Sequence, residues 1–150
     1  CLYLGDTAET TIYEARAGAY DYVTVGKFRL KEDIIVVDLK KINQISPFIE
    51  GLDCLEYAIN KEYLNKINDE MGKIMRRSDS ALDYVPTQYI TDFVKSIIHD
   101  GKAEYAGIEY KSVMHSGGYN LALFDPDLFE CIGTEVYGID TIDYRKHPIV

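Results

Sequence analysis

The chain has 150 residues, of which 47% are hydrophobic, and its formal net charge is −9. This length suits one domain with a buried core, and the composition argues against an intrinsically disordered chain. The negative charge argues against nucleic-acid binding, because a protein that neutralises phosphates needs a basic surface. No apolar run approaches the length of a membrane span or a signal-peptide core, so we expect no membrane partner.

The three cysteines, Cys1, Cys54 and Cys131, are widely spaced, form no CxxC pair and stand far from every histidine. This pattern matches neither a disulfide framework nor a zinc site, so we expect no bound metal and a reducing, cytoplasmic location. The sequence also has no glycine-rich phosphate loop, GxSxG elbow or HExxH motif. It opens at Cys1 in what reads as the middle of a strand, which predicts that the natural protein continues upstream.

The first elements predicted from the sequence are a strand and a helix. Cys1–Leu4 is a short apolar strand, and Asp6 with Glu9 three residues later is typical of a capping box at a helix start. Gly18 is expected to end this helix. The apolar side of the helix would hold Ala8, Ile12 and Ala15.

Two strands are predicted next. Tyr22–Leu30 alternates between apolar and polar residues, and Gly26 within it suggests a bulge. Asp33–Leu39 is a continuous apolar run, which is typical of a strand buried on both faces.

Two helices and three strands complete the predicted order. Apolar residues at helical spacing run from Leu55 to Met75, and a further helix begins at Pro86 and is terminated by Gly101. The three strands are expected at Glu104–Lys111, Asn120–Phe124 and Glu130–Ile139. Because strands and helices do not alternate strictly, a doubly wound parallel sheet is disfavoured. We predict an α+β domain with a mainly antiparallel sheet, whole or split, and flanking helices.

Two distant segments carry the candidate functional side chains. Glu14 lies on the first helix, about 200° around its axis from Ile12, and Ser112 closes the strand before a Gly-Gly turn. The ordinary interpretation of each is structural, as a solvent-facing carboxylate and as a hydroxyl that satisfies a turn amide. Tyr3 is one of 13 tyrosines and by default belongs to the core. His115 has the chemistry of a general base, but the sequence identifies no acid that would orient it.

Several stretches of the chain resemble the RES domain family, which is named for an arginine, a glutamate and a serine. In chain order they are CLYLGDTAETTIYEAR, then YVTVGKFRL followed by DIIVVDL, then YVPTQYITDFVKSI, and finally GIEYKSVMHSGGYNLALFDPDLFE. Their order and spacing cover most of the chain, which we interpret as a single RES-like domain, 1–150, that lacks its N-terminal segment. The stretch 40–80 is not typical of the family and is expected to be a helical insertion.

The resemblance implies a fold related to ADP-ribosyltransferases, with NAD⁺ as the substrate and no cofactor. Many family members are toxins that degrade NAD⁺ by phosphorolysis or hydrolysis and are restrained by a helix-turn-helix antitoxin. Inorganic phosphate and such an antitoxin are therefore implied partners. By motif position, the family's catalytic glutamate and serine fall on Glu14 and Ser112, and its active-site tyrosine falls on Tyr3. The family's arginine would lie upstream of Tyr3, outside this chain.

These residue types suit cleavage of the nicotinamide–ribose bond, which builds positive charge on the ribose. Glu14 would stabilise that charge, Ser112 would position the ribose or the nicotinamide amide, and Tyr3 would pack against a ring.

Two other functions stay open at this point. One is a protein ADP-ribosyltransferase, which mass spectrometry would detect as ADP-ribose added to protein. The other is a non-catalytic nucleotide-binding or interaction module, which would bind NAD⁺ without turnover.

Overall fold

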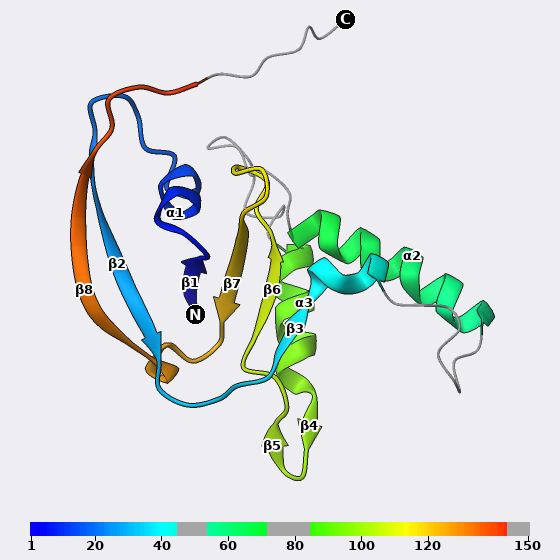
Figure 1. Ribbon diagram of the computed structural model, residues 1–150. Helices are drawn as coiled ribbons and strands as arrows, with labels where there is room; N and C mark the ends of the chain where they lie inside the picture. Colours follow the sequence, from blue (N-terminus) through cyan, green and yellow to red (C-terminus); the bar gives the residue numbers. More distant parts are fainter. Residues whose placement is uncertain (45–53, 72–84, 144–150) are drawn as a thin grey trace, which may run out of the picture.

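The computed structural model describes residues 1–44, 54–71 and 85–143. Its main sheet has four strands in the order β1-β7-β6-β3 (Figure 1). These strands are β1 (Leu2–Gly5), β3 (Val36–Asp38), β6 (Gly107–Lys111) and β7 (Tyr119–Leu123). β7 pairs antiparallel with both β1 and β6, whereas β3 runs parallel to β6.

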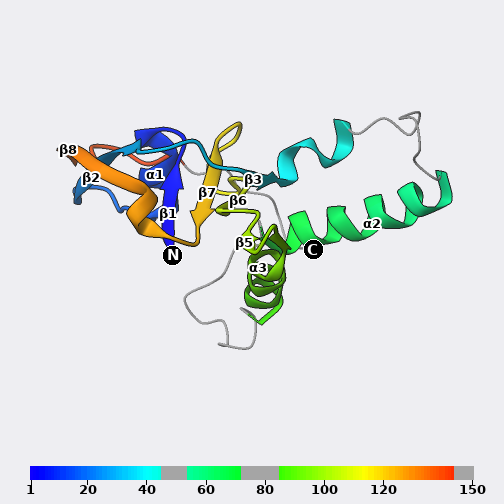
Figure 2. The same ribbon diagram turned by 90° about the horizontal axis from the view of Figure 1, so that it is seen from below.

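A separate two-stranded antiparallel ribbon joins β2 (Tyr22–Leu30) to β8 (Phe129–Gly138). The helices are α1 (Ala8–Glu14), α2 (Cys54–Met71) and α3 (Val85–Ser96), with short 3-10 turns η1 (Leu39–Gln44) and η3 (Pro126–Leu128). The ribbon and α1 lie at the β1 end of the sheet, and α2 and α3 lie at its β6–β3 end (Figures 1 and 2). The predicted α+β class with a split, mainly antiparallel sheet is confirmed.

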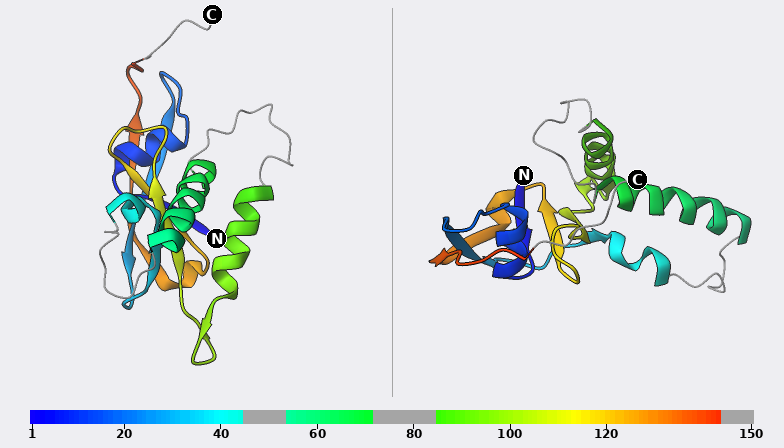
Figure 3. Two further views of the ribbon diagram at one scale, coloured as in Figure 1. Left: turned by 90° about the vertical axis from the view of Figure 1, so that its right-hand side faces the viewer. Right: turned by 90° about the horizontal axis from the view of Figure 1, so that it is seen from above.

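The hydrophobic core lies between the β6 side of the sheet and the two longer helices. Ile108 of β6 is fully buried and packs with Val94 of α3 and Leu39 of η1. From α2, Leu64 and Ile67 pack against the same cluster. Burial of each such side chain contributes about 1.5–3 kcal/mol. The views in Figure 3 show α2 extending away from the sheet on this side, while α3 runs alongside it.

The predicted strand Asp33–Leu39 is wrong in length and in burial. Only Val36–Asp38 pairs, as an edge strand of half-buried residues, and the 3-10 turn begins at Leu39. The Asp38 carboxylate accepts a hydrogen bond from the Lys40 N–H at 2.9 Å. Such a local bond competes with strand pairing, and it turns the chain out of the sheet.

The helix that was expected to end at Gly101 instead ends at Ser96. Its final turn is closed by the Ser96 hydroxyl, which donates to the Phe93 carbonyl at 2.6 Å. A small hairpin follows, formed by β4 (Ile98–His99) and β5 (Lys102–Ala103), and Gly101 occupies its turn with φ of 77°. A glycine adopts that backbone conformation without strain, so its role here is to turn the hairpin.

Other predicted elements agree with the structure to within a few residues. The strand Tyr22–Leu30 is found with the predicted bounds, and its register shifts between Lys27 and Phe28, next to the predicted bulge at Gly26. The end of the helix predicted to run to Met75 lies outside the described residues, which stop at Met71 in this helix.

Candidate active site

Helix α1 begins at a different cap from the one predicted. Thr7, not Asp6, is the N-cap residue: its backbone is extended and its hydroxyl accepts the Thr10 N–H at 3.0 Å. The Asp6 carboxylate instead accepts from the Thr10 hydroxyl at 2.6 Å and from the Tyr119 N–H at 3.3 Å. The start of α1 is thereby tied to the start of β7.

The side of α1 that faces the sheet is polar, contrary to the predicted apolar stripe. Thr10 is fully buried, whereas Ala15 of that stripe is exposed, because the helix ends at Glu14 and Arg16 then adopts a positive φ of 53°. Gly18 therefore does not end the helix. Residues four apart lie on one side of a helix, so Thr10 and Glu14 point together toward the sheet.

Glycines at the strand ends, which have no side chain, allow α1 to approach the sheet closely. A Cβ atom placed on Gly118 would lie 2.9 Å from His115 Nδ1 and closer still to Thr10 Oγ1. On β1, a Cβ atom at Gly5 would lie 2.7 Å from Thr11 Oγ1. Glycine at these two positions is therefore a condition for bringing Glu14 to the strand ends.

Strand alternation places the partners of Glu14 on one face of the sheet. Tyr110 and Ser112 are two residues apart on β6 and its extension, where the Ser112 N–H donates to the Gly118 carbonyl at 2.9 Å. Asn120 of β7 lies directly opposite Tyr110. Side chains at such positions share a face, so Ser112 and Asn120 lie next to each other on it.

Glu14 meets both of these side chains through a single oxygen. Its Oε1 atom accepts a hydrogen bond from Ser112 Oγ at 2.6 Å and another from Asn120 Nδ2 at 2.7 Å. Glu14 and Ser112 are half-buried, and Asn120 is 7% exposed. The two residues assigned as catalytic from the sequence are thus in direct contact, although 98 positions separate them in the chain.

The hydroxyl of Ser112 is fully engaged in this arrangement. It accepts the N–H groups of Met114 at 3.2 Å and His115 at 3.0 Å, and it donates its own proton to Glu14. A hydroxyl has one proton and two lone pairs, so no lone pair remains for attack on a substrate. Ser112 is therefore better suited to orienting the Glu14 carboxylate than to acting as a nucleophile.

The His115 side chain holds α1 in place rather than contacting Glu14. Its Nδ1 atom lies 2.8 Å from Thr10 Oγ1, and its ring stacks on Tyr13 with centroids 5.1 Å apart. Its Nε2 atom lies 3.8 Å from the Glu9 carboxylate. All three contacts are with residues of α1, so the geometry favours a positioning role over the general base considered from the sequence.

Tyr3 of β1 is largely open to solvent, with 69% of its surface exposed. Tyr110, two residues before Ser112, is half-buried. Burial first, and then the neighbouring Glu14 and Tyr3 side chains, raise the pKa of Tyr110 to about 12. Glu14 and Tyr3 therefore each lie close enough to Tyr110 to influence its charge.

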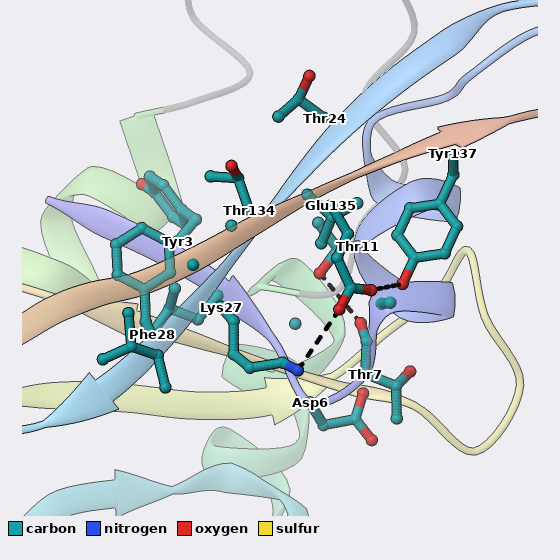
Figure 4. A pocket seen from close by; sticks show the side chains of 17 residues that line it. Tyr3, Asp6, Thr7, Thr11, Thr24, Lys27, Phe28, Thr134, Glu135 and Tyr137 are labelled. Atoms are coloured by element: carbon teal, nitrogen blue, oxygen red, sulfur yellow. Dashed lines mark hydrogen bonds and ion pairs between the residues drawn. The ribbon is translucent and has the colours of Figure 1, made fainter.

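A hollow of about 530 Å³ lies on another side of α1, between β1 and the ribbon (Figure 4). Tyr3 and Phe28 line one end of it, and Lys27, Glu135 and Tyr137 lie toward the other. Lining residues include Tyr3 but neither Glu14 nor Ser112. Neither catalytic candidate therefore lines this hollow, although Gly5, which does line it, lies directly opposite Asn120.

Sequence reasoning missed Asn120, Thr10 and Tyr110. Asn120 carried a usable signal, because it is a polar residue at the start of a predicted apolar strand and has the same strand parity as Ala122, which is buried. Thr10 and Tyr110 carried none, since their roles depend on pairing between segments about 100 residues apart.

Among the described residues, no group of three or more histidine, cysteine, aspartate or glutamate side chains is arranged to hold a metal ion. Within the same residues, no helix is both long enough and apolar enough to cross a membrane.

Comparison with known proteins gives one match. The family model described as RES domain matches residues 1–144, which is nearly the whole chain. No curated protein and no solved structure matches it.

Proposed function

The chain belongs to the RES domain family, and from this premise we propose that it is an enzyme that cleaves the nicotinamide–ribose bond of NAD⁺. The observation that carries the proposal is the Glu14 carboxylate, which Ser112 and Asn120 hold at 2.6 and 2.7 Å. A carboxylate fixed before the reaction stabilises a developing cation without having to reorganise during it.

In the proposed reaction, the bond between the ribose C1′ and the nicotinamide nitrogen breaks, and its electron pair stays on the nitrogen. Nicotinamide therefore leaves neutral and needs no proton from the protein. The ribose passes through an oxocarbenium-like state, next to which Glu14 supplies negative charge. An oxygen of inorganic phosphate or of water then bonds to C1′, and when water attacks, one proton is released to solvent.

Roles for the other residues follow from their contacts. Ser112 orients Glu14, because its hydroxyl donates a hydrogen bond to the carboxylate. Tyr3, which is largely exposed and lines the hollow between β1 and the ribbon, is proposed to pack against a ring of the dinucleotide.

The proposal is tested by incubating the entire natural protein with NAD⁺, with and without phosphate, and following nicotinamide release. We expect release in at least one buffer, and ADP-ribose 1″-phosphate as the second product if phosphate is the acceptor. An intact, folded protein that releases no nicotinamide in either buffer would contradict the proposal.

One alternative draws on a specific observation. Because Ser112, Asn120 and Glu14 satisfy each other's hydrogen bonds, the same cluster could serve only to fasten α1 to the sheet in a non-catalytic nucleotide-binding module. Glu14→Gln separates the two functions, since the amide oxygen still accepts both hydrogen bonds but the charge is lost. Unchanged NAD⁺ cleavage in this variant would remove Glu14 from catalysis.

Other proposals rest on family membership alone. These are transfer of ADP-ribose to protein, a cytoplasmic location, and a role as a toxin held in check by a helix-turn-helix antitoxin. Growth arrest on expression, relieved by Glu14→Gln or by co-expression of such a protein, would support the toxin proposal.

A further inference from the structure

Asn120 is the buried partner of Glu14. It stands near the start of β7, directly across from Gly5 of β1 and Tyr110 of β6. Only 7% of its surface is exposed. A carboxylate only accepts hydrogen bonds, so the amide must turn its NH₂ group toward Glu14, as the 2.7 Å contact has it.

Both hydrogen bonds to Glu14 fall on the same oxygen. Ser112 and Asn120 approach Oε1 from different strands, and together they fix the direction of the carboxylate. Within residues 1–44, 54–71 and 85–143, no side chain or backbone group donates to Oε2. The second oxygen is thus the one left for a ligand hydroxyl or a developing cation.

The chemistry of the donor matters as much as its position. An amide is neutral, so it orients the carboxylate without cancelling its charge. A lysine or arginine at the same place would hold Glu14 through an ion pair and would repel a positively charged ribose.

We propose that Asn120 is a positioning residue that, with Ser112, holds Glu14 through Oε1 and presents Oε2 to the ribose. This inference rests on the proposed NAD⁺-cleaving function. It assigns Asn120 an effect on the chemical step, because the fixed carboxylate is worth most when charge develops, and little effect on the initial binding of NAD⁺.

The test compares Asn120→Asp with Asn120→Ala in the entire natural protein, using nicotinamide release over a range of pH. Above neutral pH, we expect each variant to lose about 10- to 100-fold in kcat while KM for NAD⁺ stays within about twofold. In Asn120→Asp the new carboxyl group has the shape of the amide but cannot donate when ionised, and it repels Glu14.

The pH profile distinguishes positioning from mere support. Two carboxyl groups in contact share a proton as the pH falls, and the protonated group donates a hydrogen bond again. Relative to the parent protein, Asn120→Asp should therefore regain activity as the pH is lowered, whereas Asn120→Ala should keep a constant deficit. The titratable groups around this pair are Tyr110 on β6 and His115, whose backbone N–H donates to the Ser112 hydroxyl. Both are present in the parent and in the two variants, so the comparison with the parent cancels their contribution.

Each outcome decides the inference. A parent-like kcat in Asn120→Ala, or an equal and pH-independent loss in both variants, overturns it while NAD⁺ cleavage by the parent stands. Variants that lose their cooperative thermal transition show instead that the amide is structural, which also overturns it. If the parent releases no nicotinamide, the proposed function fails, and the role of Asn120 falls with it.

Discussion

The junction between α1 and the sheet differs from the β2–β8 ribbon in how each treats its polar groups. At the junction, Thr10 is fully buried and Asn120 nearly so, and their polar atoms are hydrogen-bonded to neighbouring side chains. On the ribbon, the ion pairs Lys27–Glu135 and Arg29–Glu130 lie on the surface, with 44–69% of each side chain exposed.

The difference shows where in the molecule a charge is held in a fixed position and is weakly screened by water. A polar group removed from water must be satisfied by the protein, and in return its geometry is fixed and its field is less screened. Exposed ion pairs are solvated and contribute little. Glu14 is therefore the better candidate for electrostatic catalysis, even though the hollow beside the ribbon contains a carboxylate of its own, Glu135.

The largest expected effect is the loss of NAD⁺ cleavage when Glu14 at the junction is substituted. Glu14→Gln should lower NAD⁺ cleavage by about 10²–10³-fold, because it removes the charge from the proposed site. Its fold should persist, since the amide oxygen still accepts from Ser112 and Asn120. The matched control is Glu130→Gln on the ribbon, which should leave nicotinamide release unchanged. Equal losses in the two variants would mean that acidity of the surface as a whole, and not the junction, supports turnover.

The next effect concerns the close approach of α1. Gly118→Ala should destabilise the fold by about 1–3 kcal/mol, because the new methyl group collides with Thr10 and His115. On the ribbon, Gly133→Ala meets nothing within 4 Å and should change stability by less than about 0.5 kcal/mol. Urea unfolding of both variants measures the contrast. Equal midpoints would show that α1 does not press on the strand ends.

The sequence predicted the framework of the junction better than its details. The α+β class, the two strands flanking the Gly-Gly turn and the helix carrying Glu14 were all predictable from local patterns. Local patterns also suggested that Ala8, Ile12 and Ala15 would face the core, which is wrong for Ala15, because it is exposed, whereas Ala8 and Ile12 are half-buried. The apolar stripe rule fails here because two glycines on distant strands open a polar contact that only the tertiary fold creates.

Distance in the chain explains the other misses. Asp6 and Glu9 match a capping box, yet the Asp6 carboxylate accepts a hydrogen bond from the Tyr119 N–H, more than 100 residues later in the chain. At Asn120 the sequence indicates a polar residue on a buried strand face, but its partner Glu14 lies 106 positions away and is identified only by the fold. A sequence predicts which residue types are available, while cross-strand register decides which of them meet.

A smaller effect should appear at alkaline pH. The pKa of Tyr110 is raised to about 12, chiefly by burial. Between about pH 10 and 12 the unfolded chain has released this proton and the native one has not, so stability falls as the pH rises through that window. Tyr110→Phe should remove a decline on the order of 1–2 kcal/mol.

The ribbon again supplies the control for this measurement. The pKa of Tyr137 is also raised, but first of all by its hydrogen bond to the exposed Glu135 carboxylate, whereas burial is the first cause at Tyr110. Tyr137→Phe should therefore alter alkaline stability less than Tyr110→Phe does. Stability curves of the two variants that coincide from pH 9 to 12 would show that the environment of Tyr110 is as open as the ribbon.

The smallest expected effect is the coupling free energy of an ion pair on the ribbon. A double-mutant cycle of Arg29→Gln and Glu130→Gln should give a coupling free energy of about 0.2–1 kcal/mol, because both side chains are largely exposed. Raising the salt concentration should reduce that coupling further, since mobile ions screen exposed charges and the screening (Debye) length, about 10 Å at 0.1 M, becomes shorter as salt is added. A coupling above about 2 kcal/mol that salt does not change would mean that the ribbon is desolvated in solution. In that case burial could no longer distinguish the junction from the ribbon, and Glu135 would become as credible a catalytic carboxylate as Glu14.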